Sequence, residues 1–219
     1  MECLLPFHSP TTILISGCTQ SGKTFFTKRL LENANYMFTI PPQKIVYAYS
    51  EYQPAFELMK QTIPNIVFHE GVPSSEDVDN YAEGLDHVIL VLDDLMLKIT
   101  HSEECVQLFT VTSHHRKVSV IFLAQNLYPP GKYARCISLN CAYVVLFRNR
   151  RDSRQVLTFG SQILPGQNNY FRTAYEKATL EQYGYLLVDL SPHSEKKYQL
   201  RTHIFPGEDI TVYVPMSIK

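Results

Sequence analysis

A glycine-rich segment of eight residues constrains the fold of this chain more than any other part of its sequence. Residues 17–24 read GCTQSGKT and fit the pattern G-x-x-x-x-G-K-[ST] with no mismatch. An apolar stretch ends just before the segment and a helical pattern opens just after it, a context that a chance glycine-rich turn rarely has. Backbone N–H groups of such a loop point at phosphates, while Lys23 reaches the β- and γ-phosphates and Thr24 offers a hydroxyl to magnesium. We therefore predict nucleotide binding by Gly17, Cys18, Thr19, Gln20, Ser21, Gly22, Lys23, Thr24 and Phe25.

Apolar, β-branched runs alternate with amphipathic stretches along the chain, which is typical of a parallel sheet covered by helices. The pattern predicts strands over residues 11–16, 44–49, 66–69, 87–92, 118–124 and 142–147. It predicts helices over residues 23–32, 54–61, 102–115 and 152–160, and a loop over residues 72–81 that leads into a further helix. With the phosphate loop between the first strand and the first helix, this order predicts an α/β P-loop NTPase fold.

The last third of the chain has less regular patterns. Residues 164–169 are predicted to form a loop and residues 176–183 a short helix. Residues 185–190 and 198–205 are predicted strands, and their short connection favours antiparallel pairing. We expect one P-loop domain over residues 1–219, with a core over about 10–160 and C-terminal strands over about 161–215 that extend the sheet.

Two carboxylates follow the most apolar of the predicted strands. Residues 88–92 are all apolar and lead into Asp93 and Asp94. An acidic side chain at the tip of a buried strand is costly unless it meets a cation or strong donors. Because a phosphate loop is present, we predict that Asp93 and Thr24 hold magnesium and that Asp94 is the general base or orients the attacking water. The alternative is that the acidic pair caps the next helix or turn.

A polar side chain, Gln125, follows the strand predicted over residues 118–124. If this strand inserts between the strand before the phosphate loop and the strand before Asp93, Gln125 lies beside the γ-phosphate, where an amide can orient water or sense hydrolysis. Such an insertion separates the additional-strand (ASCE) division, with its RecA- and FtsK-like members, from small-molecule kinases and GTPases. The chain has no N-K-x-D guanine-reading motif. The alternative is that Gln125 only begins a loop.

Basic clusters follow two of the predicted elements. Arg116 precedes the strand over residues 118–124, and Arg148 and Arg151 follow the strand over residues 142–147. An ATPase that works in a ring needs an arginine that projects into a neighbour's site and stabilises charge in the transition state. Arg116 is our first choice for this arginine finger, and Arg148 or Arg151 is the second. The alternatives are a solvated basic turn and sequence-independent contacts with DNA phosphates.

Composition and charge narrow the class of protein further. The formal net charge is −1, so no overall positive field indicates a nucleic-acid partner. No apolar run approaches the about eighteen residues of a membrane span, and the first residues lack the basic segment and apolar core of a secretory signal. The five cysteines include no C-x-x-C pair, which argues for a reducing compartment and against a zinc site or a disulfide framework.

Taken in order, these segments resemble the FtsK/HerA superfamily of DNA-pumping ATPases. The segments that carry this resemblance are GCTQSGKT, VILVLDD and SHHRKVSVIFLAQN. Further segments resemble the poxvirus-type genome-packaging ATPases, and most closely those of polinton-like and adintovirus-like double-stranded DNA viruses. They read KYARCISLNCAYVVLFRNRRDSRQV, LPGQ, YGYLLVDL and LRTHIFPGE. The resemblance covers about residues 10–215.

The resemblance implies a homo-oligomeric ring, a pentamer or hexamer, that hydrolyses ATP with Mg²⁺ and threads double-stranded DNA into a preformed capsid. It implies a capsid or portal-vertex partner, no membrane, and a place inside an infected host cell or in the virion. It carries nucleotide binding over to Gly17, Gly22, Lys23 and Thr24, magnesium to Asp93, water activation to Asp94 and sensing to Gln125. Family members commonly have Glu at the position of Asp94, so this chain departs from them there.

Two other functions stay open at this stage. One is a nucleoside or nucleotide kinase of P-loop fold that acts as a monomer, against which the predicted strand before Gln125 and the lack of an obvious lid segment count. The other is a nucleotide-stabilised capsid-assembly protein with little turnover.

Overall fold

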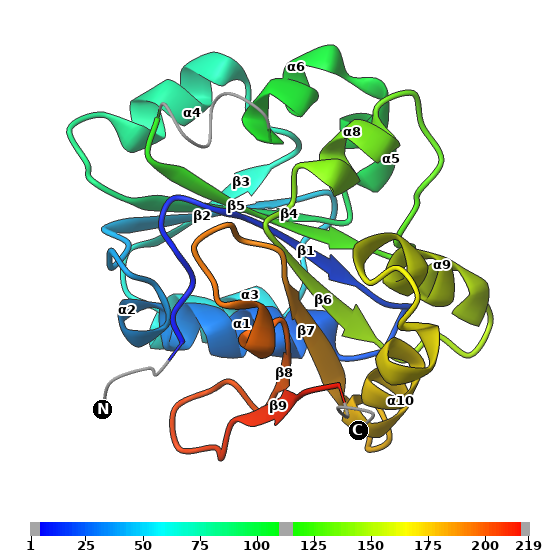
Figure 1. Ribbon diagram of the computed structural model, residues 1–219. Helices are drawn as coiled ribbons and strands as arrows, with labels where there is room; N and C mark the ends of the chain where they lie inside the picture. Colours follow the sequence, from blue (N-terminus) through cyan, green and yellow to red (C-terminus); the bar gives the residue numbers. More distant parts are fainter. Residues whose placement is uncertain (1–4, 110–115, 216–219) are drawn as a thin grey trace.

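The strand that precedes the phosphate loop lies in the middle of the sheet. In the computed structural model, which describes residues 5–109 and 116–215, the strands form one nine-stranded sheet in the order β3-β2-β4-β5-β1-β6-β7-β8-β9 (Figure 1). The parallel strands are β1 (Thr12–Ser16), β2 (Lys44–Tyr49), β3 (Ile66–Glu70), β4 (Val88–Asp93), β5 (Val118–Ala124) and β6 (Tyr143–Phe147). The antiparallel strands are β7 (Tyr185–Asp189), β8 (Leu200–Thr202) and β9 (Thr211–Tyr213).

The position of β5 decides the division of the fold. It pairs in parallel with β1 on one side, where Ser16 is opposite Ala124, and with β4 on the other, where Leu92 is opposite Phe122. The strand inserted between the phosphate-loop strand and the Asp93 strand is therefore present, as the additional-strand division requires. The antiparallel pairing expected for the C-terminal strands is also confirmed, since β7 pairs with β8.

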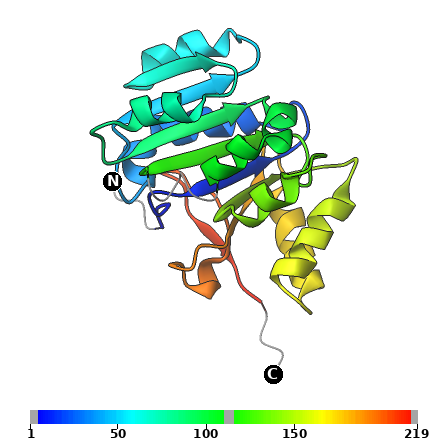
Figure 2. The ribbon, with the colours of Figure 1, turned by 90° about the horizontal axis from the view of Figure 1, so that it is seen from above.

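Helices cover both faces of the sheet (Figures 1 and 2). Alternate strand residues point to opposite faces, so each face has its own apolar cluster. One face packs against α1 (Lys23–Glu32), α2 (Ala34–Met37) and α3 (Ala55–Thr62). The other packs against α4 (Ser75–Ala82), α5 (Met96–His101), α6 (Glu103–Gln107), α8 (Ala134–Leu139), α9 (Ser153–Ile163) and α10 (Asn168–Ala178). Of the helices in the described ranges, none combines the length and the apolar character needed to cross a membrane.

The helix predicted over residues 176–183 is wrong, and so is part of the loop predicted over residues 164–169. The structure has α10 at Asn168–Ala178 instead, followed by a turn that leads into β7. Its buried side chains are Phe171, Ala174, Tyr175 and Ala178, at the spacing of one helical face. That spacing was visible in the sequence, but α10 begins without a side-chain cap at Gln167, so its start carried no signal.

Other differences concern short or shifted elements. The loop predicted over residues 72–81 is wrong for most of its length, because α4 begins at Ser75, where the Ser74 side chain and Asp77 form a capping box. The helix predicted over residues 102–115 is seen as α6 from Glu103 to Gln107, and its end at residues 110–115 lies outside the described residues. The strand predicted over residues 198–205 is reduced to β8, with a short 3₁₀ turn, η2 (Lys196–Tyr198), before it. Elements of three to six residues that the sequence pattern missed are α2, α5, α8 and β9.

Candidate nucleotide-binding site

The predicted phosphate loop connects the end of β1 to the start of α1. Gly17 is buried, and its N–H donates to the carbonyl oxygen of Ala124 at the tip of β5, at 3.2 Å. Gln20 and Gly22 have positive φ angles of 64° and 108°, and Gly22 is the N-cap of α1. The left-handed backbone at Gly22 suits a residue without a Cβ atom. The loop therefore turns sharply and presents the N-terminal end of α1 to its own interior.

Lys23 is folded into this loop. Its Nζ donates to the carbonyl oxygens of Gly17, at 2.6 Å, and Cys18, at 3.0 Å. Burial lowers the pKa of the Lys23 ammonium, and the charges of Asp93, Cys18 and Asp94 oppose this shift. The structure thus brings Lys23 into the electrostatic field of both predicted carboxylates.

The interior of the loop suits phosphate oxygens. The Ser21 hydroxyl is buried without a hydrogen-bond partner in the described part of the chain. A Cβ atom at Gly17 would lie 2.5 Å from Ser21 Oγ and 2.7 Å from Phe147 Cβ, so the start of the loop has no room for a side chain. Buried polar groups are nearly always paired in folded proteins. An unpaired hydroxyl in a loop of inward-pointing amides is therefore what a phosphate group would satisfy.

Asp93 ends β4 and is buried, with 7% of its surface exposed. The Tyr47 hydroxyl, on the neighbouring strand β2, donates to Asp93 Oδ2 at 2.6 Å. Burial raises the pKa of the Asp93 carboxyl, while the hydrogen bond from Tyr47 acts in the opposite direction. Burial and the Asp93 charge raise the pKa of Tyr47 well above its ordinary value.

Sequence reasoning missed Tyr47, because its partner lies 46 residues away in the chain. The only feature of the sequence that pointed to Tyr47 was a tyrosine within a predicted buried strand. Strand order, which puts β2 beside β4, is what makes this tyrosine a neighbour of the carboxylate.

The side chains available for magnesium are oxygen donors. In the part of the chain that the structure describes, no group of three or more histidine, cysteine, aspartate or glutamate side chains could hold a metal ion by itself. Magnesium at phosphate sites is usually bound by one or two protein oxygens together with phosphate oxygens and waters. Thr24, at the start of α1, and Asp93 fit this kind of shared site, since the loop before Thr24 follows β1 and Asp93 ends β4 at the same edge of the sheet.

Asp94 and Gln125 lie at this edge as well. Asp94 directly follows β4 and is exposed, with a left-handed backbone φ of 55°. Gln125 directly follows β5 and is exposed, one residue after the carbonyl that accepts from Gly17. The carboxyl ends of neighbouring parallel strands meet at one edge, so the structure brings Asp93, Asp94 and Gln125 to the phosphate loop.

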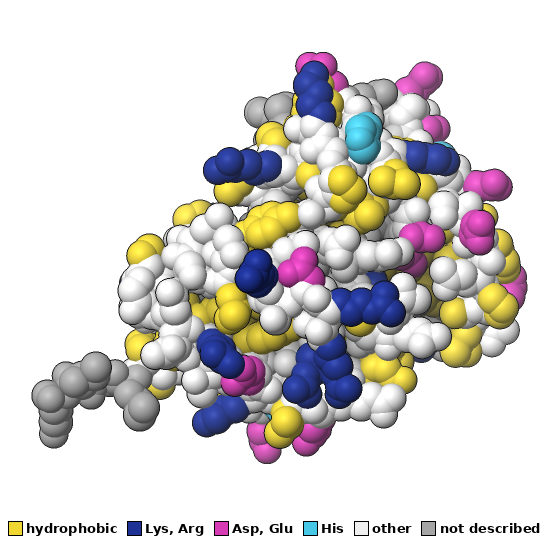
Figure 3. Space-filling model, turned by 90° about the vertical axis from the view of Figure 1, so that its right-hand side faces the viewer, with side chains coloured by type: hydrophobic (Ala, Val, Ile, Leu, Met, Phe, Trp, Pro, Cys, Tyr) yellow, Lys and Arg dark blue, Asp and Glu magenta, His cyan; other side chains and the backbone are white. Residues whose placement is uncertain are grey.

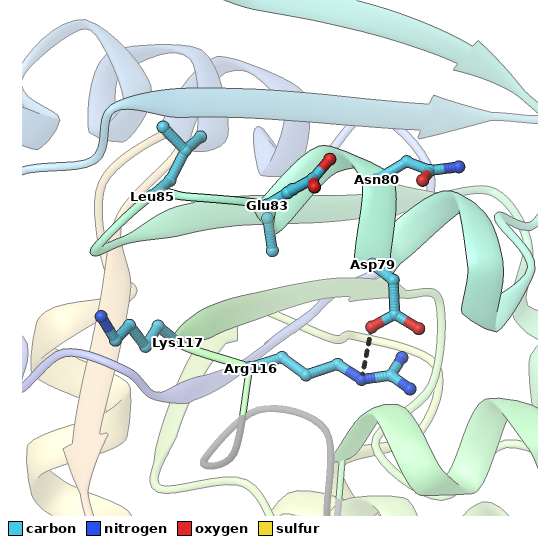
Figure 4. Close-up of a pocket in the computed structure, with 7 residues that line it drawn as sticks. Asp79, Asn80, Glu83, Leu85, Arg116 and Lys117 are labelled. Carbon is cyan, nitrogen blue, oxygen red and sulfur yellow. Dashed lines mark ion pairs between the residues drawn. The ribbon is translucent and has the colours of Figure 1, made fainter.

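Arg116 lies at the opposite edge of the sheet. It precedes β5, whose seven residues alone span about 23 Å at about 3.3 Å per residue and separate it from Gln125. Its guanidinium pairs with Asp79 of α4 at 2.8 Å (Figure 4). It also donates to the Ser75 carbonyl at 3.2 Å. A shallow hollow of about 460 Å³ opens there, far from the phosphate loop. Arg116 cannot reach the site of its own chain, so a finger role requires a neighbouring chain.

Arg148 and Arg151 lie at the rim of the phosphate loop instead. Both are exposed, and they line a hollow of about 380 Å³ together with Cys18, Gln20, Ser21, Arg150 and residues 180–184. Figure 3 shows the edge of the molecule toward which β1 and β6 point in Figure 1, with lysine and arginine side chains spread over it. The loop edge therefore carries exposed positive charge that the net charge of −1 conceals.

The strand order and the loop between β1 and α1 define an additional-strand P-loop NTPase fold. No protein-family model matches the chain, and no curated protein sequence does. Solved structures are similar to it: the DNA-packaging ATPase B204 from Sulfolobus turreted icosahedral virus superimposes with a TM-score of 0.59 and 11% identity, covering 95% of this chain and 99% of that one. The genome packaging NTPase B204 from Sulfolobus turreted icosahedral virus 2, in complex with AMPPCP, superimposes with a TM-score of 0.57 and 12% identity, covering 94% of this chain and 98% of that one. The complex of the same protein with ATP-gammaS superimposes with a TM-score of 0.54 and 12% identity, with the same coverage of both chains. At these identities the likeness is one of fold.

Proposed function

We propose that this chain is an ATPase that drives DNA translocation and packages viral double-stranded DNA into a capsid as a homo-oligomeric ring. The observation that carries the proposal is the insertion of β5 between β1 and β4. It puts Gln125 at the edge where Lys23 and the acidic pair already meet, and these are the parts needed to hold a triphosphate and position water. A P-loop kinase, in which the β1 and β4 strands would be adjacent, is disfavoured by the same observation.

Each residue at the site has a distinct role in this proposal. The loop amides and the Ser21 hydroxyl bind the phosphates, and Lys23 leaves the loop carbonyls to neutralise charge on the β- and γ-phosphates. Magnesium, when bound, would be held by Thr24 and Asp93 and would neutralise charge that develops on the phosphates. Asp94 orients or deprotonates the attacking water, and Gln125 senses the γ-phosphate.

DNA translocation and ring formation are supported by three observations of different kinds. The downstream segments resemble packaging ATPases, the fold is similar to that of B204, and exposed arginines line a hollow beside the loop. Arginine contacts with phosphates are independent of DNA sequence, as packaging requires. The proposed partners are duplex DNA, other copies of this chain and a capsid or portal-vertex protein. The motor would act inside an infected host cell or remain with the virion.

The test is the ATPase rate as a function of protein concentration, with and without duplex DNA. We expect the rate per subunit to rise with concentration, because a neighbour contributes an arginine, and to rise again with duplex DNA. Lys23→Ala should abolish turnover and weaken ATP binding. Lys28→Ala, on the same helix and facing Glu32, is the matched control and should behave like the wild type.

Three outcomes would contradict the proposal. Full turnover in Lys23→Ala would place the site elsewhere. Transfer of phosphate to a nucleoside in place of water would indicate a kinase. Binding of ATP without hydrolysis, at high protein concentration and with DNA present, would favour a nucleotide-stabilised assembly protein.

A further inference from the structure

Two large aromatic side chains are exposed beside the phosphate loop. Phe25, in the first turn of α1, is 63% exposed, and Tyr183, in the turn between α10 and β7, is 53% exposed. Their ring centroids lie 6.4 Å apart at an interplanar angle of 34°. Neither side chain belongs to the apolar clusters on the two faces of the sheet. Core packing therefore does not explain why these rings are where they are.

Both rings open onto the place where a nucleotide would bind. They line a hollow of about 370 Å³ whose other walls are Gln20, Gly22, Lys23 and Thr24. Lys23 and Thr24 face the phosphates in the proposed function. Because the rings and these two residues line one hollow, a base attached to phosphates at Lys23 and Thr24 is within reach of the rings.

The Tyr183 ring lies directly against the loop. A Cβ atom at Gly22 would be 2.9 Å from Tyr183 Cδ1 and 3.2 Å from Tyr183 Cβ. A residue from the turn before β7 is therefore in contact with the N-cap of α1, although 161 positions separate the two in the sequence (183 minus 22). This contact positions the Tyr183 ring beside the phosphate loop.

The backbone keeps this ring exposed. Tyr183 has a positive φ of 62°, which is uncommon for a bulky residue and tends to persist where a site depends on it. Gly184 fixes the turn, since its N–H donates to the Glu181 carbonyl at 3.1 Å and a Cβ atom there would lie 2.6 Å from the Ala178 carbonyl oxygen. The chain thus adopts a costly conformation that leaves an aromatic face open to solvent.

We propose that the base of the bound nucleotide stacks on Tyr183, with Phe25 closing the same hollow. This inference rests on the proposed function, since it takes the phosphates to lie in the loop. Stacking on an aromatic ring accepts every base, because each base has a π-face, and larger bases gain more contact area. The site should therefore prefer purine nucleotides, ATP and GTP, over CTP and UTP.

The test compares the binding of ATP with the binding of inorganic tripolyphosphate, which has the phosphates and no base. We expect Tyr183→Ala to weaken ATP binding roughly 5- to 150-fold, the loss of one stacked base, and to leave tripolyphosphate binding unchanged. Tyr183→Phe keeps the ring and should bind ATP as the wild type does. Tyr36→Ala is the matched control, because Tyr36 on α2 is 55% exposed and lies away from the loop.

Lys23→Ala separates this inference from the proposed function, because it should weaken both ligands. If the wild type binds tripolyphosphate and ATP through Lys23 but Tyr183→Ala binds ATP normally, the base site is overturned and the phosphate site stands. An equal loss of both ligands in Tyr183→Ala would also overturn it, because the ring would then only shape the loop at Gly22. If the wild type binds neither ligand, both proposals fail.

A fluorescent reporter gives an independent measurement. The chain contains no tryptophan, so Tyr183→Trp adds a single indole at the site. We expect ATP and GTP to quench its emission and tripolyphosphate to leave it unchanged. Equal quenching by tripolyphosphate would contradict stacking.

Discussion

In the described part of the chain, Tyr47 is the one side chain that donates a hydrogen bond to the Asp93 carboxylate. Its ring is fully buried against Phe56 and Phe68, so the tyrosine is fixed in place before any ligand arrives. A donor of this kind orients a metal-binding carboxylate and keeps one of its oxygens occupied. In the proposed site, the other oxygen of Asp93 is then available to the metal or its waters.

Tyr47→Phe should therefore affect both stability and magnesium use. The free energy of unfolding should fall by about 1–3 kcal/mol, because a buried carboxylate oxygen loses its donor. The Mg²⁺ concentration for half-maximal ATPase activity should rise roughly 10- to 100-fold. Urea unfolding without Mg²⁺ and a magnesium titration of the rate measure the two effects.

Tyr49→Phe is the control for this prediction, because Tyr49 lies on the same strand and face without a hydrogen bond to Asp93. If Tyr47→Phe and Tyr49→Phe behave alike in both measurements, the hydrogen bond does not position the carboxylate.

His87 gives the fold a pH dependence of its own. It is buried at 1% exposure, with Nδ1 2.6 Å from the Ile40 carbonyl oxygen and Nε2 2.7 Å from Ser119 Oγ. Burial lowers its pKa, and the Ile40 hydrogen bond acts in the opposite direction. Because the unfolded chain binds this proton more readily, the contribution of His87 to stability is present above about pH 6.5 and is lost as the pH falls through that value toward the folded pKa.

His87→Asn should flatten this dependence. We expect the free energy of unfolding of the wild type to decrease more steeply between about pH 7 and pH 5 than that of the variant, measured by urea unfolding at each pH. Parallel pH curves for the two proteins would show that His87 does not titrate differently in the folded state.

Among the elements, the two antiparallel strands β7 and β8 are joined by a buried ion pair. Arg201 Nη2 lies 2.6 Å from Asp189 Oδ2, and the two side chains are 3% and 1% exposed. Asp189 also accepts from the Ser191 backbone N–H and the Ser194 hydroxyl. Removing one partner of such a pair leaves a buried charge uncompensated, which is strongly destabilising.

Arg201→Met should lower the free energy of unfolding by about 3–5 kcal/mol, as measured by urea denaturation. Arg172→Met is the matched control, because its pair with Glu176 on α10 is more than half exposed and should change stability by at most about 0.5 kcal/mol. Equal effects in the two variants would contradict a special role for the buried pair.

Elements with a strong pattern were predictable residue by residue. The bounds of α1, β2 and β5 agree with the sequence prediction, because long apolar runs and a glycine-rich turn define their ends. Short elements were not predictable: α2 and α8 have only four and six residues, which is too few for a periodicity to emerge. The helix α10 was shifted because Gln167 gives no cap signal at its start.

The candidate site divides in the same way. The roles of the loop residues and of Asp93 could be predicted from local sequence, because the motif and the apolar strand that indicate them lie directly beside them in the chain. Tyr47 and Tyr183 reach the site only through strand order and a tertiary turn, which no local pattern encodes. The position of Arg116 also depends on topology: the sequence places it beside the Gln125 strand, and only the direction of β5 puts it at the far edge.

At the scale of the whole molecule, the location of Arg116 leads to a test of ring function. If Arg116 completes the neighbour's site, Arg116→Ala should lower turnover roughly 10³-fold or more and leave ATP binding nearly intact. Mixing Arg116→Ala with Lys23→Ala should restore part of the activity, because some pairs of neighbours then contain one intact loop and one intact arginine. The ATPase rate of the mixture against that of each variant alone is the measurement.

The same mixing with Arg148→Ala and Arg151→Ala decides between the candidate fingers. Arg154→Ala, an exposed arginine on α9, is the control and should keep wild-type turnover. Full turnover in Arg116→Ala, together with complementation by Arg148→Ala or Arg151→Ala, would assign the finger to the rim of the loop.

The strand β5 has a mechanical consequence in such a ring. All seven of its residues are buried, and hydrogen-bonded strands flank it on both sides, so it cannot slide or bend without disrupting the sheet. Gln125 follows one end and Arg116 precedes the other. In the proposed ring, a displacement at the phosphate end would therefore be transmitted along β5 to the far edge of the subunit. Communication between neighbouring subunits would then need no hinge between the two ends of this strand.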